Sequence, residues 1–449
     1  MTADRLSDLT AALLAEARRA GAGAADAIAV EGSALSIDMR GGRLEQAERS
    51  EGIEVGLRVL IGGRQACVSA SDTAPGTLAA MAERAVAMAR EAPEDPHAGL
   101  ADPAQLARSF DVAALELDDP APEPDPAALE RDALRAEAAA LAFSGISQVD
   151  QASAGYGRRR VHLAATNGFS GGYARTSRSV SCVAITGSGT AMERDWCAES
   201  RIFQADLPDP EDVGRIAAER TLARAGARKP PTGAFPVLFD ERVAASLIGH
   251  LLAAVNGTAV ARGASWLRDA LGQPVLPAGL DLIEDPHRAR IPGSRPFDAE
   301  GLATRRRAIV EGGVLTGWIL DLATARKLGM ESTANAARGT LSPPAPAPSN
   351  VALTQGAVGR DVLIREMGTG LLVTSLIGAS VNPTTGDYSR GASGLWVEGG
   401  QIAYPVNECT IAGNLRDMLR SIRPANDARA HLSLQVPSLL VEGLTLAGS

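Results

Sequence analysis

The stretch from Ser380 to Arg420 constrains the fold of this chain more than any other part of the sequence. Two short apolar runs, 395–397 and 402–404, flank a turn at 398–401 that contains two adjacent glycines. This pattern predicts a β-hairpin whose glycines adopt positive φ. Asn414 then precedes apolar residues with helical spacing, so it is expected to cap a helix. The stretch therefore predicts a rigid hairpin and a capped helix on which a site could be built.

The polar segment before this hairpin is the main candidate site. Glycines bracket residues of several different chemistries, and turn signals precede them, so the sequence predicts a loop that displays its side chains. Folding alone gives little reason for such a composition, and we interpret the segment as a substrate-cleft or interface element. A structural loop that caps the domain is the alternative. The candidate residues are Asp387, Tyr388, Ser389, Arg390 and Gly391.

The length of 449 residues predicts two domains. The best boundary is the segment 229–233, where two prolines and a glycine follow a helical pattern. We expect an α+β chain with an N-terminal domain at 1–228, built from helices and mainly antiparallel strands. The C-terminal domain at 232–449 should be β-rich with a few helices. An acidic, proline-rich connection at 94–125 should run extended over the surface.

The N-terminal region shows the same succession of predicted elements twice. In each half, four strand-like segments stand between two helical patterns, which suggests a repeated α-β-β-β-β-α plan although the residues themselves do not match. The helices are expected at 3–20, 75–92, 126–142 and 210–226.

Charge and composition narrow the classes of function. A net charge of −9 and an isoelectric point near 5.3 argue against a nucleic-acid partner, which requires a basic face. We interpret the arginine runs 158–160 and 305–307 as solvated strands or turns. The four cysteines are widely spaced and should be reduced, mostly buried thiols. No apolar run reaches the roughly 18 residues that a membrane span needs, so we expect no membrane association and a cytoplasmic location.

Metal-ligand spacing is missing from the sequence. The five histidines are dispersed, with neither an H-E-x-x-H nor an H-x-H pattern. His250 lies on the edge of a helical apolar stripe, where it is either a partly buried helix residue or a lining residue of a substrate cleft. Cys409 should be a packed, inert thiol. A further alternative is an unconventional metal site that joins His250, His431 and Cys409.

Several segments closely resemble the TldD/PmbA family in its PmbA (TldE) branch. They are 381–392, 404–406 and 410–418, together with Gly249-His250, the proline-rich 342–350 and the opening helix with its glycine-punctuated strands. The resemblance covers essentially the whole chain.

This resemblance implies a particular kind of peptidase. In the family, a TldD-type chain carries a zinc motif, H-E-x-x-x-H, and a later cysteine ligand, and a PmbA-type partner completes a heterodimer around a cleavage chamber. The implied substrates are unfolded or flexible peptides, with peptide-toxin maturation and antitoxin turnover as the associated roles. The older family label, modulator of DNA gyrase, reflects those toxins.

Matched residue by residue, the zinc motif would fall on 245–250, where only His250 remains. Ala245 stands at the first ligand, Ser246 stands at the catalytic glutamate, and no cysteine follows Cys409. A zinc-activated water needs at least three protein ligands and a general base. The resemblance therefore implies no catalytic residue and no metal in this chain, and zinc on a TldD-like partner subunit.

We accordingly expect a peptidase subunit that is inactive alone. When its partner is absent, a homodimer is one possible state of the chain. The alternative is a stand-alone regulatory or binding protein of a toxin or gyrase system, without peptidase activity.

Overall fold

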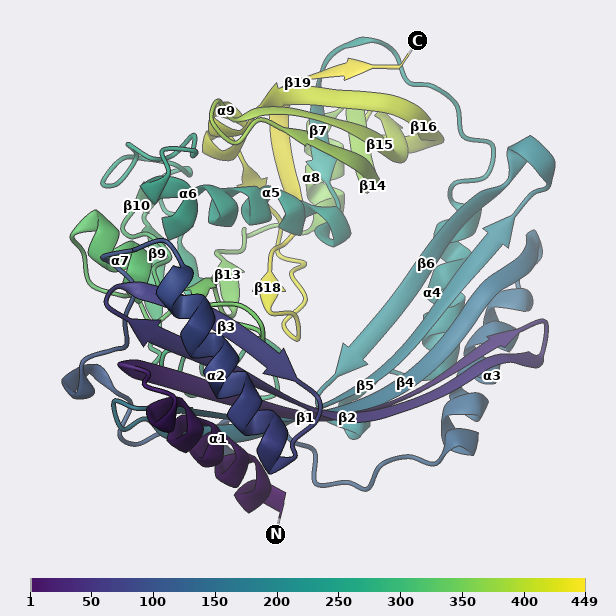
Figure 1. Cartoon of the computed structure of the whole chain (residues 1–449). Helices are drawn as coiled ribbons and strands as arrows, with labels where there is room; N and C mark the ends of the chain where they lie inside the picture. The colour runs from purple at the N-terminus through teal and green to yellow at the C-terminus, as the bar shows by residue number, and fades with distance from the viewer. Residues whose placement is uncertain (1, 449) are drawn as a thin grey trace.

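The computed structural model describes residues 2–448. A long, curved antiparallel sheet forms the N-terminal half, and a β-rich C-terminal half lies over its inner side (Figure 1). The strand order is β3-β2-β1-β4-β5-β6. The strands are β1 (Ala24–Arg40), β2 (Arg43–Ile61), β3 (Arg64–Ala70), β4 (Ile146–Ala165), β5 (Ser170–Thr186) and β6 (Glu193–Arg201). The predicted α+β class is confirmed.

The N-terminal sheet is made of two repeats, each of which follows an α-β-β-β-α order. The helices are α1 (Thr2–Arg19), α2 (Pro75–Glu91), α3 (Pro126–Leu141) and α4 (Pro210–Leu222). The repetition was predicted, but the prediction of four strands in each repeat is wrong, because each repeat has three. Strand β2 runs without a break through residues 43–52, whose backbone stays paired with β1. These residues are all exposed, so their sequence lacks the alternation of apolar and polar residues by which a strand is predicted.

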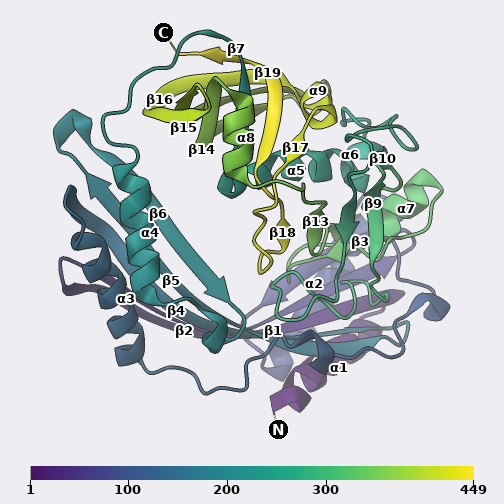
Figure 2. The ribbon, with the colours of Figure 1, turned by 180° about the vertical axis from the view of Figure 1, so that it is seen from behind.

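All four helices cover the same face of this sheet. In strand β1, Ala27 and Ala29 pack with α1 and α2, whereas Leu35 and Ile37 pack with α3. These residues have the same parity, so they share one face, here called the outer face. Ile28 lies on the opposite, inner face and packs with residues of the C-terminal half. Figure 2 shows α3 and α4 outside the curve and the C-terminal half inside it.

The C-terminal half is organised around a second, closed sheet. Its strand order is β16-β15-β14-β7-β19-β17, and β16 also pairs with β19, which closes the sheet on itself. The strands are β7 (Gly233–Phe239), β14 (Gly370–Val381), β15 (Asp387–Glu398), β16 (Gln401–Asn414), β17 (Arg423–Pro424) and β19 (Leu439–Ala447). The helices α5 (Glu241–Ala254), α8 (Arg360–Met367) and α9 (Leu415–Arg420) flank it. The predicted hairpin turn between β15 and β16 is confirmed, with Gly399 and Gly400 at positive φ.

Short elements lie between the closed sheet and the long sheet (Figure 1). They are α6 (Gly257–Ala261), α7 (Leu322–Leu328), β8 (Leu282–Glu284), β9 (Arg307–Glu311), β10 (Val314–Leu315), β11 (Ala336–Ala337), β12 (Ala345–Pro346), β13 (Val351–Leu353) and β18 (Leu434–Gln435). Within the described residues, no helix combines the length and the apolar character that crossing a membrane demands.

The two halves meet in a buried ionic contact on the inner face. Asp26 in β1 accepts a hydrogen bond of 2.7 Å from Arg58 in β2 and forms an ion pair with Arg338, which follows β11. The Thr340 hydroxyl donates to Glu54 at 2.6 Å. Separating the partners of a buried ion pair is costly, because it leaves an uncompensated charge. This contact therefore holds segment 338–340 in place on the sheet.

Gly56 in β2 lies directly under this segment, and we predict that Gly56→Ala destabilises the protein. A Cβ atom there would lie 2.1 Å from the Thr340 carbonyl oxygen, which forces the backbone apart. Overpacking of this kind costs about 2 kcal/mol of unfolding free energy. The matched control is Gly52→Ala in the same strand, where a Cβ meets no atom within 4 Å. Equal urea midpoints for the two variants would contradict the close approach.

Candidate functional site

Helix α5 positions His250. The Asp240 carboxylate caps the helix by accepting from the Arg242 backbone N–H at 3.2 Å, and it also forms an ion pair of 2.8 Å with Arg360. Leu247 and Leu251 are fully buried against the closed sheet. His250 follows Leu247 by three residues, so the helix turns its ring toward the edge of that buried stripe.

The predicted loop at 387–391 is wrong, because these residues form the first part of strand β15. Their backbone pairs with β16 from Asp387 opposite Asn414 to Gly391 opposite Thr410. Strand β14 pairs on the other side of β15. Backbone groups bonded on both sides hold a strand extended whatever the polarity of its side chains. The candidate residues therefore point alternately to the two faces of a sheet.

Tyr388 and Arg390 lie on the face of β15 that packs against α5. The Tyr388 and His250 ring centroids are 6.0 Å apart, and the ring planes meet at 73°. Three buried polar atoms make no hydrogen bond of normal geometry with any described residue: His250 Nε2, the Tyr388 hydroxyl and Arg390 Nε. We call His250, Tyr388 and Arg390 the His250 cluster. Unpaired buried polar atoms are costly, so their gathering at one place indicates a site for a polar ligand.

The electrostatics of the His250 cluster favour neutral rings. Burial lowers the pKa of His250, and the positive charge of Arg390 lowers it further. Burial also raises the pKa of Tyr388 to about 12, although the charge of Arg390 and its close approach to the phenol, which falls short of normal hydrogen-bond geometry, oppose this shift. At neutral pH the cluster therefore offers a neutral imidazole, a phenol and one cation. These groups can hold the carbonyl and N–H groups of a peptide, or its carboxylates, by hydrogen bonds.

The other three candidate residues lie on the opposite face of β15. Asp387 is exposed and accepts hydrogen bonds from Thr385 Oγ1 at 2.6 Å and from Asn414 Nδ2 at 3.1 Å, and these bonds lower its pKa. Asn414 in turn caps α9, as predicted, by accepting from the Arg416 N–H. Asp387 thus supports a turn and a helix start. Ser389 is partly buried, and Gly391 has ordinary strand geometry.

The residues at the position of the zinc motif do not fit a zinc ion. Ala245 packs against the core, and the Ser246 hydroxyl donates to the Val243 carbonyl at 2.7 Å. Neither side chain can replace a histidine ligand or a general base. In the part of the chain that the structure describes, no three His, Cys, Asp or Glu side chains gather into a group that could hold a metal.

The structure also keeps apart the residues of the alternative metal site. His431 Nε2 lies 3.3 Å from Glu199 of the N-terminal sheet. The Cys409 thiol donates to the Ala392 carbonyl at 3.2 Å, and burial raises its pKa to about 11, as expected for a packed, inert thiol. His250, His431 and Cys409 therefore do not form one site.

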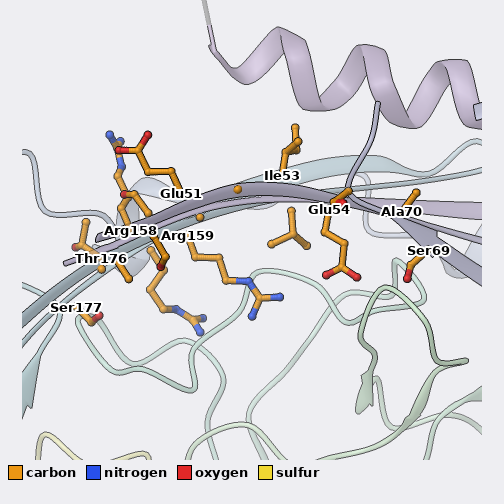
Figure 3. Close-up of a pocket in the computed structure, with 18 residues that line it drawn as sticks. Glu51, Ile53, Glu54, Ser69, Ala70, Arg158, Arg159, Thr176 and Ser177 are labelled. Atoms are coloured by element: carbon orange, nitrogen blue, oxygen red, sulfur yellow. The ribbon is translucent and has the colours of Figure 1, made fainter. Parts of the chain in front are cut away.

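A hollow of about 940 Å³ lies at the middle of the long sheet. Figure 3 shows that its lining belongs to both faces: Glu51 and Ile53 point toward the helix side, whereas Glu54 and Arg159 point to the other side. It is thus an uncovered stretch of sheet between the two helix pairs, and its inner face is open toward the C-terminal half.

A second cavity, of about 180 Å³, lies between the inner face and the C-terminal half. Its lining includes four arginines from distant parts of the sequence, Arg159, Arg175, Arg295 and Arg338. The sequence interpretation missed this group. Within the run 158–160, Arg158 and Arg160 form ion pairs with Asp118 and Glu31, but the strand turns Arg159 to the inner face. Side chains alternate between the two faces of a strand, and this was the one sequence signal that could have distinguished Arg159 from Arg158 and Arg160.

Comparisons with known proteins agree with this architecture. Three family models match in succession: PmbA/TldA metallopeptidase domain 1 at residues 25–89, the central domain at 101–225 and the C-terminal domain at 232–448. The fold and the matched segments place the chain among proteins that are built from the PmbA/TldA metallopeptidase domains.

Curated relatives specify the family. The metalloprotease PmbA of Escherichia coli O157:H7 is 38% identical over 415 residues, which cover 92% of this chain and 90% of the relative. A PmbA homologue from Haemophilus influenzae is 37% identical over 96% of this chain and 94% of its own length. The chain belongs to the PmbA/TldD family.

Solved structures share the whole fold. A proposed modulator of DNA gyrase from Bacteroides thetaiotaomicron superposes with a TM-score of 0.92 at 27% identity and covers 100% of both chains. TldE from Thermococcus kodakarensis superposes with a TM-score of 0.85 over 98% of this chain and 100% of its own. At 18% identity, the second match shows the fold alone.

The lowered pKa of His250 predicts a pH-dependent effect of replacing it. The unfolded chain binds a proton on this ring at a higher pH than the folded protein does, so wild type loses stability as the pH falls below about 6.5. His250→Gln removes this loss. Urea unfolding at about pH 7.5 and about pH 5 should therefore show the variant gaining stability relative to wild type at the lower pH.

His250→Phe provides a second side chain that cannot titrate, with a different shape. Both variants should show the same shift with pH, whatever their stability at neutral pH. A stability difference from wild type that does not change with pH would show that His250 is not held neutral.

Proposed function

We propose that this chain is the PmbA-type subunit of a two-chain metallopeptidase and that the zinc ion is held by a TldD-like partner. The observation that carries the proposal is the composition of α5, where Ala245 and Ser246 stand at the positions that the family resemblance assigns to a ligand and a general base. The similarity to proteins named metalloprotease supports a role in peptide hydrolysis. A family chain that cannot fit zinc contributes to that reaction by assembling with one that can.

The substrates in this proposal are unfolded or flexible peptides, as in peptide-toxin maturation and antitoxin turnover. The His250 cluster supports this class because its unpaired groups match the hydrogen-bonding groups of a peptide backbone. Pairing of a peptide with an exposed strand edge does not apply at β15, because β14 and β16 occupy both of its edges. Recognition there would use side chains, which suits a wall of a shared chamber.

Reconstitution tests this proposal. The chain and a TldD-like chain from the same genome are purified separately and together, and digestion of a flexible peptide is followed by mass spectrometry. We expect a stable complex that digests the peptide and loses activity with a chelator, while this chain alone shows no digestion. Chelator-sensitive digestion by this chain alone would contradict the proposal, and so would the absence of any complex.

A stand-alone regulatory role is the second candidate. It is favoured by one observation, the strong similarity to a protein described as a proposed modulator of DNA gyrase. In that case the purified chain should form a homodimer that ignores the TldD-like chain and binds gyrase or a toxin directly.

Within the reconstituted complex, we predict that Arg390→Ala lowers kcat/KM at least tenfold. The substitution removes the only cation of the His250 cluster, and a charged hydrogen bond to substrate contributes about 1.5–3 kcal/mol. Arg416→Ala, which removes an exposed arginine at the start of α9, is the control and should change kcat/KM less than twofold. Equal activity of the two variants would contradict a role of the His250 cluster in substrate binding.

A further inference from the structure

In the four-arginine cavity, Arg338 pairs with Asp26, but Arg159, Arg175 and Arg295 form no ion pair with any described residue. Arg159 and Arg175 lie directly opposite each other on β4 and β5, an arrangement of like charges that destabilises a sheet. Arg159 is exposed and makes no hydrogen bond or ion pair with any described residue. Burial lowers the pKa of Arg175, and the charges of Arg159 and Arg295 lower it further.

Three guanidinium nitrogens of the arginines that line this cavity are buried and make no hydrogen bond with any described residue: Arg175 Nε, Arg295 Nε and Arg338 Nη2. The Arg338 side chain is 0% exposed, so water does not solvate it from the surface. Their remaining hydrogen bonds position these arginines. Arg175 donates to the Ser294 carbonyl at 2.6 Å, and Arg295 donates to the Ala336 and Ala347 carbonyls.

The one carboxylate in the lining is already engaged. Asp298 accepts backbone N–H groups from Glu300, Leu302 and Ala336 at 2.9–3.1 Å. Asp26, which lies outside the lining, pairs with Arg338 but also with Arg58. The described residues thus leave an excess of positive charge around the cavity.

The rest of the lining indicates the kind of anion. Apolar and aromatic side chains from both halves form the wall beside the arginines: Ile28, Val161, Leu163, Tyr173 and Phe297. A volume of about 180 Å³ is below the usual 300–1,000 Å³ of a pocket for a whole cofactor. It suits a single carboxylate together with one apolar side chain, and guanidinium groups match a planar carboxylate in two-point hydrogen bonding.

The cavity continues into the uncovered inner face of the sheet, since Arg159 and Arg175 line both hollows. Beyond them the floor consists of small residues, among them Gly32, Gly52 and Gly157. Such a floor leaves room for an extended main chain that leads away from the arginines.

We propose that this cavity binds the C-terminal carboxylate of a peptide, with the last side chain against the apolar wall and the preceding residues along the inner face. This inference rests on the proposed function, because it takes peptides as the substrates. It assigns to this chain a site that anchors the end of the substrate, separate from the His250 cluster.

The test measures binding by the full, isolated chain with fluorescence anisotropy. The probes are a fluorescein-labelled pentapeptide that ends in leucine with a free carboxylate, the same peptide as its C-terminal amide, and inorganic phosphate as competitor. We expect the acid to bind at least tenfold more tightly than the amide. Equal binding of acid and amide would overturn the proposal, and so would phosphate binding without any preference for the acid.

Arg159→Ala is the diagnostic variant, because Arg159 has no partner whose loss would disturb folding. It should weaken binding of the acid at least tenfold and leave binding of the amide unchanged. The matched control is Arg160→Ala, which removes the neighbouring arginine on the outer face, where Arg160 pairs with Glu31. If both variants weaken binding equally, the effect is one of general charge and the proposal fails.

The failure of this inference can be told apart from the failure of the proposed function. A chain that forms an active complex with a TldD-like subunit but shows no preference for the free carboxylate would overturn the cavity assignment alone. A chain that forms no complex would overturn the proposed function, whatever its peptide binding.

Discussion

The antiparallel pairing of β1 with β4 is the constraint on which the rest of the structure depends. It runs from Asp26 opposite Ala165 to Met39 opposite Ala152 and joins the first strands of the two N-terminal repeats into one sheet. Because the pairing fixes the side-chain parity of both repeats, all four helices cover the outer face. The inner face is thereby left for the C-terminal half, which makes both the buried contact at Asp26 and the arginine cavity possible.

The α5 residues that the family resemblance aligns with the zinc motif lack the side chains that a catalytic zinc ion requires. Helix α5 is firmly capped and packed, and it presents His250 beside Tyr388, but Ala245 and Ser246 cannot bind or activate a metal-bound water. In this account the helix serves assembly and substrate contact. We propose two separate polar sites, the His250 cluster on the closed sheet and the arginine cavity between the two halves.

The features that the sequence predicted correctly are governed by local rules. The turn at Gly399-Gly400, the Asn414 cap and the four N-terminal helices depend on residues close together in the chain. The loop predicted at 387–391 and the break predicted within the residues of β2 were wrong. In both places, pairing with neighbouring strands holds the backbone extended. The arginine cavity was missed since Arg159, Arg175, Arg295 and Arg338 meet only in the folded chain.

The central claim is that this chain takes part in zinc-dependent peptide hydrolysis without holding the zinc. Native mass spectrometry of the reconstituted complex and of its separated subunits tests it most directly. The account predicts one zinc ion in the complex, retained by the TldD-like subunit, and none on this chain. Zinc bound stoichiometrically to this chain alone would contradict it.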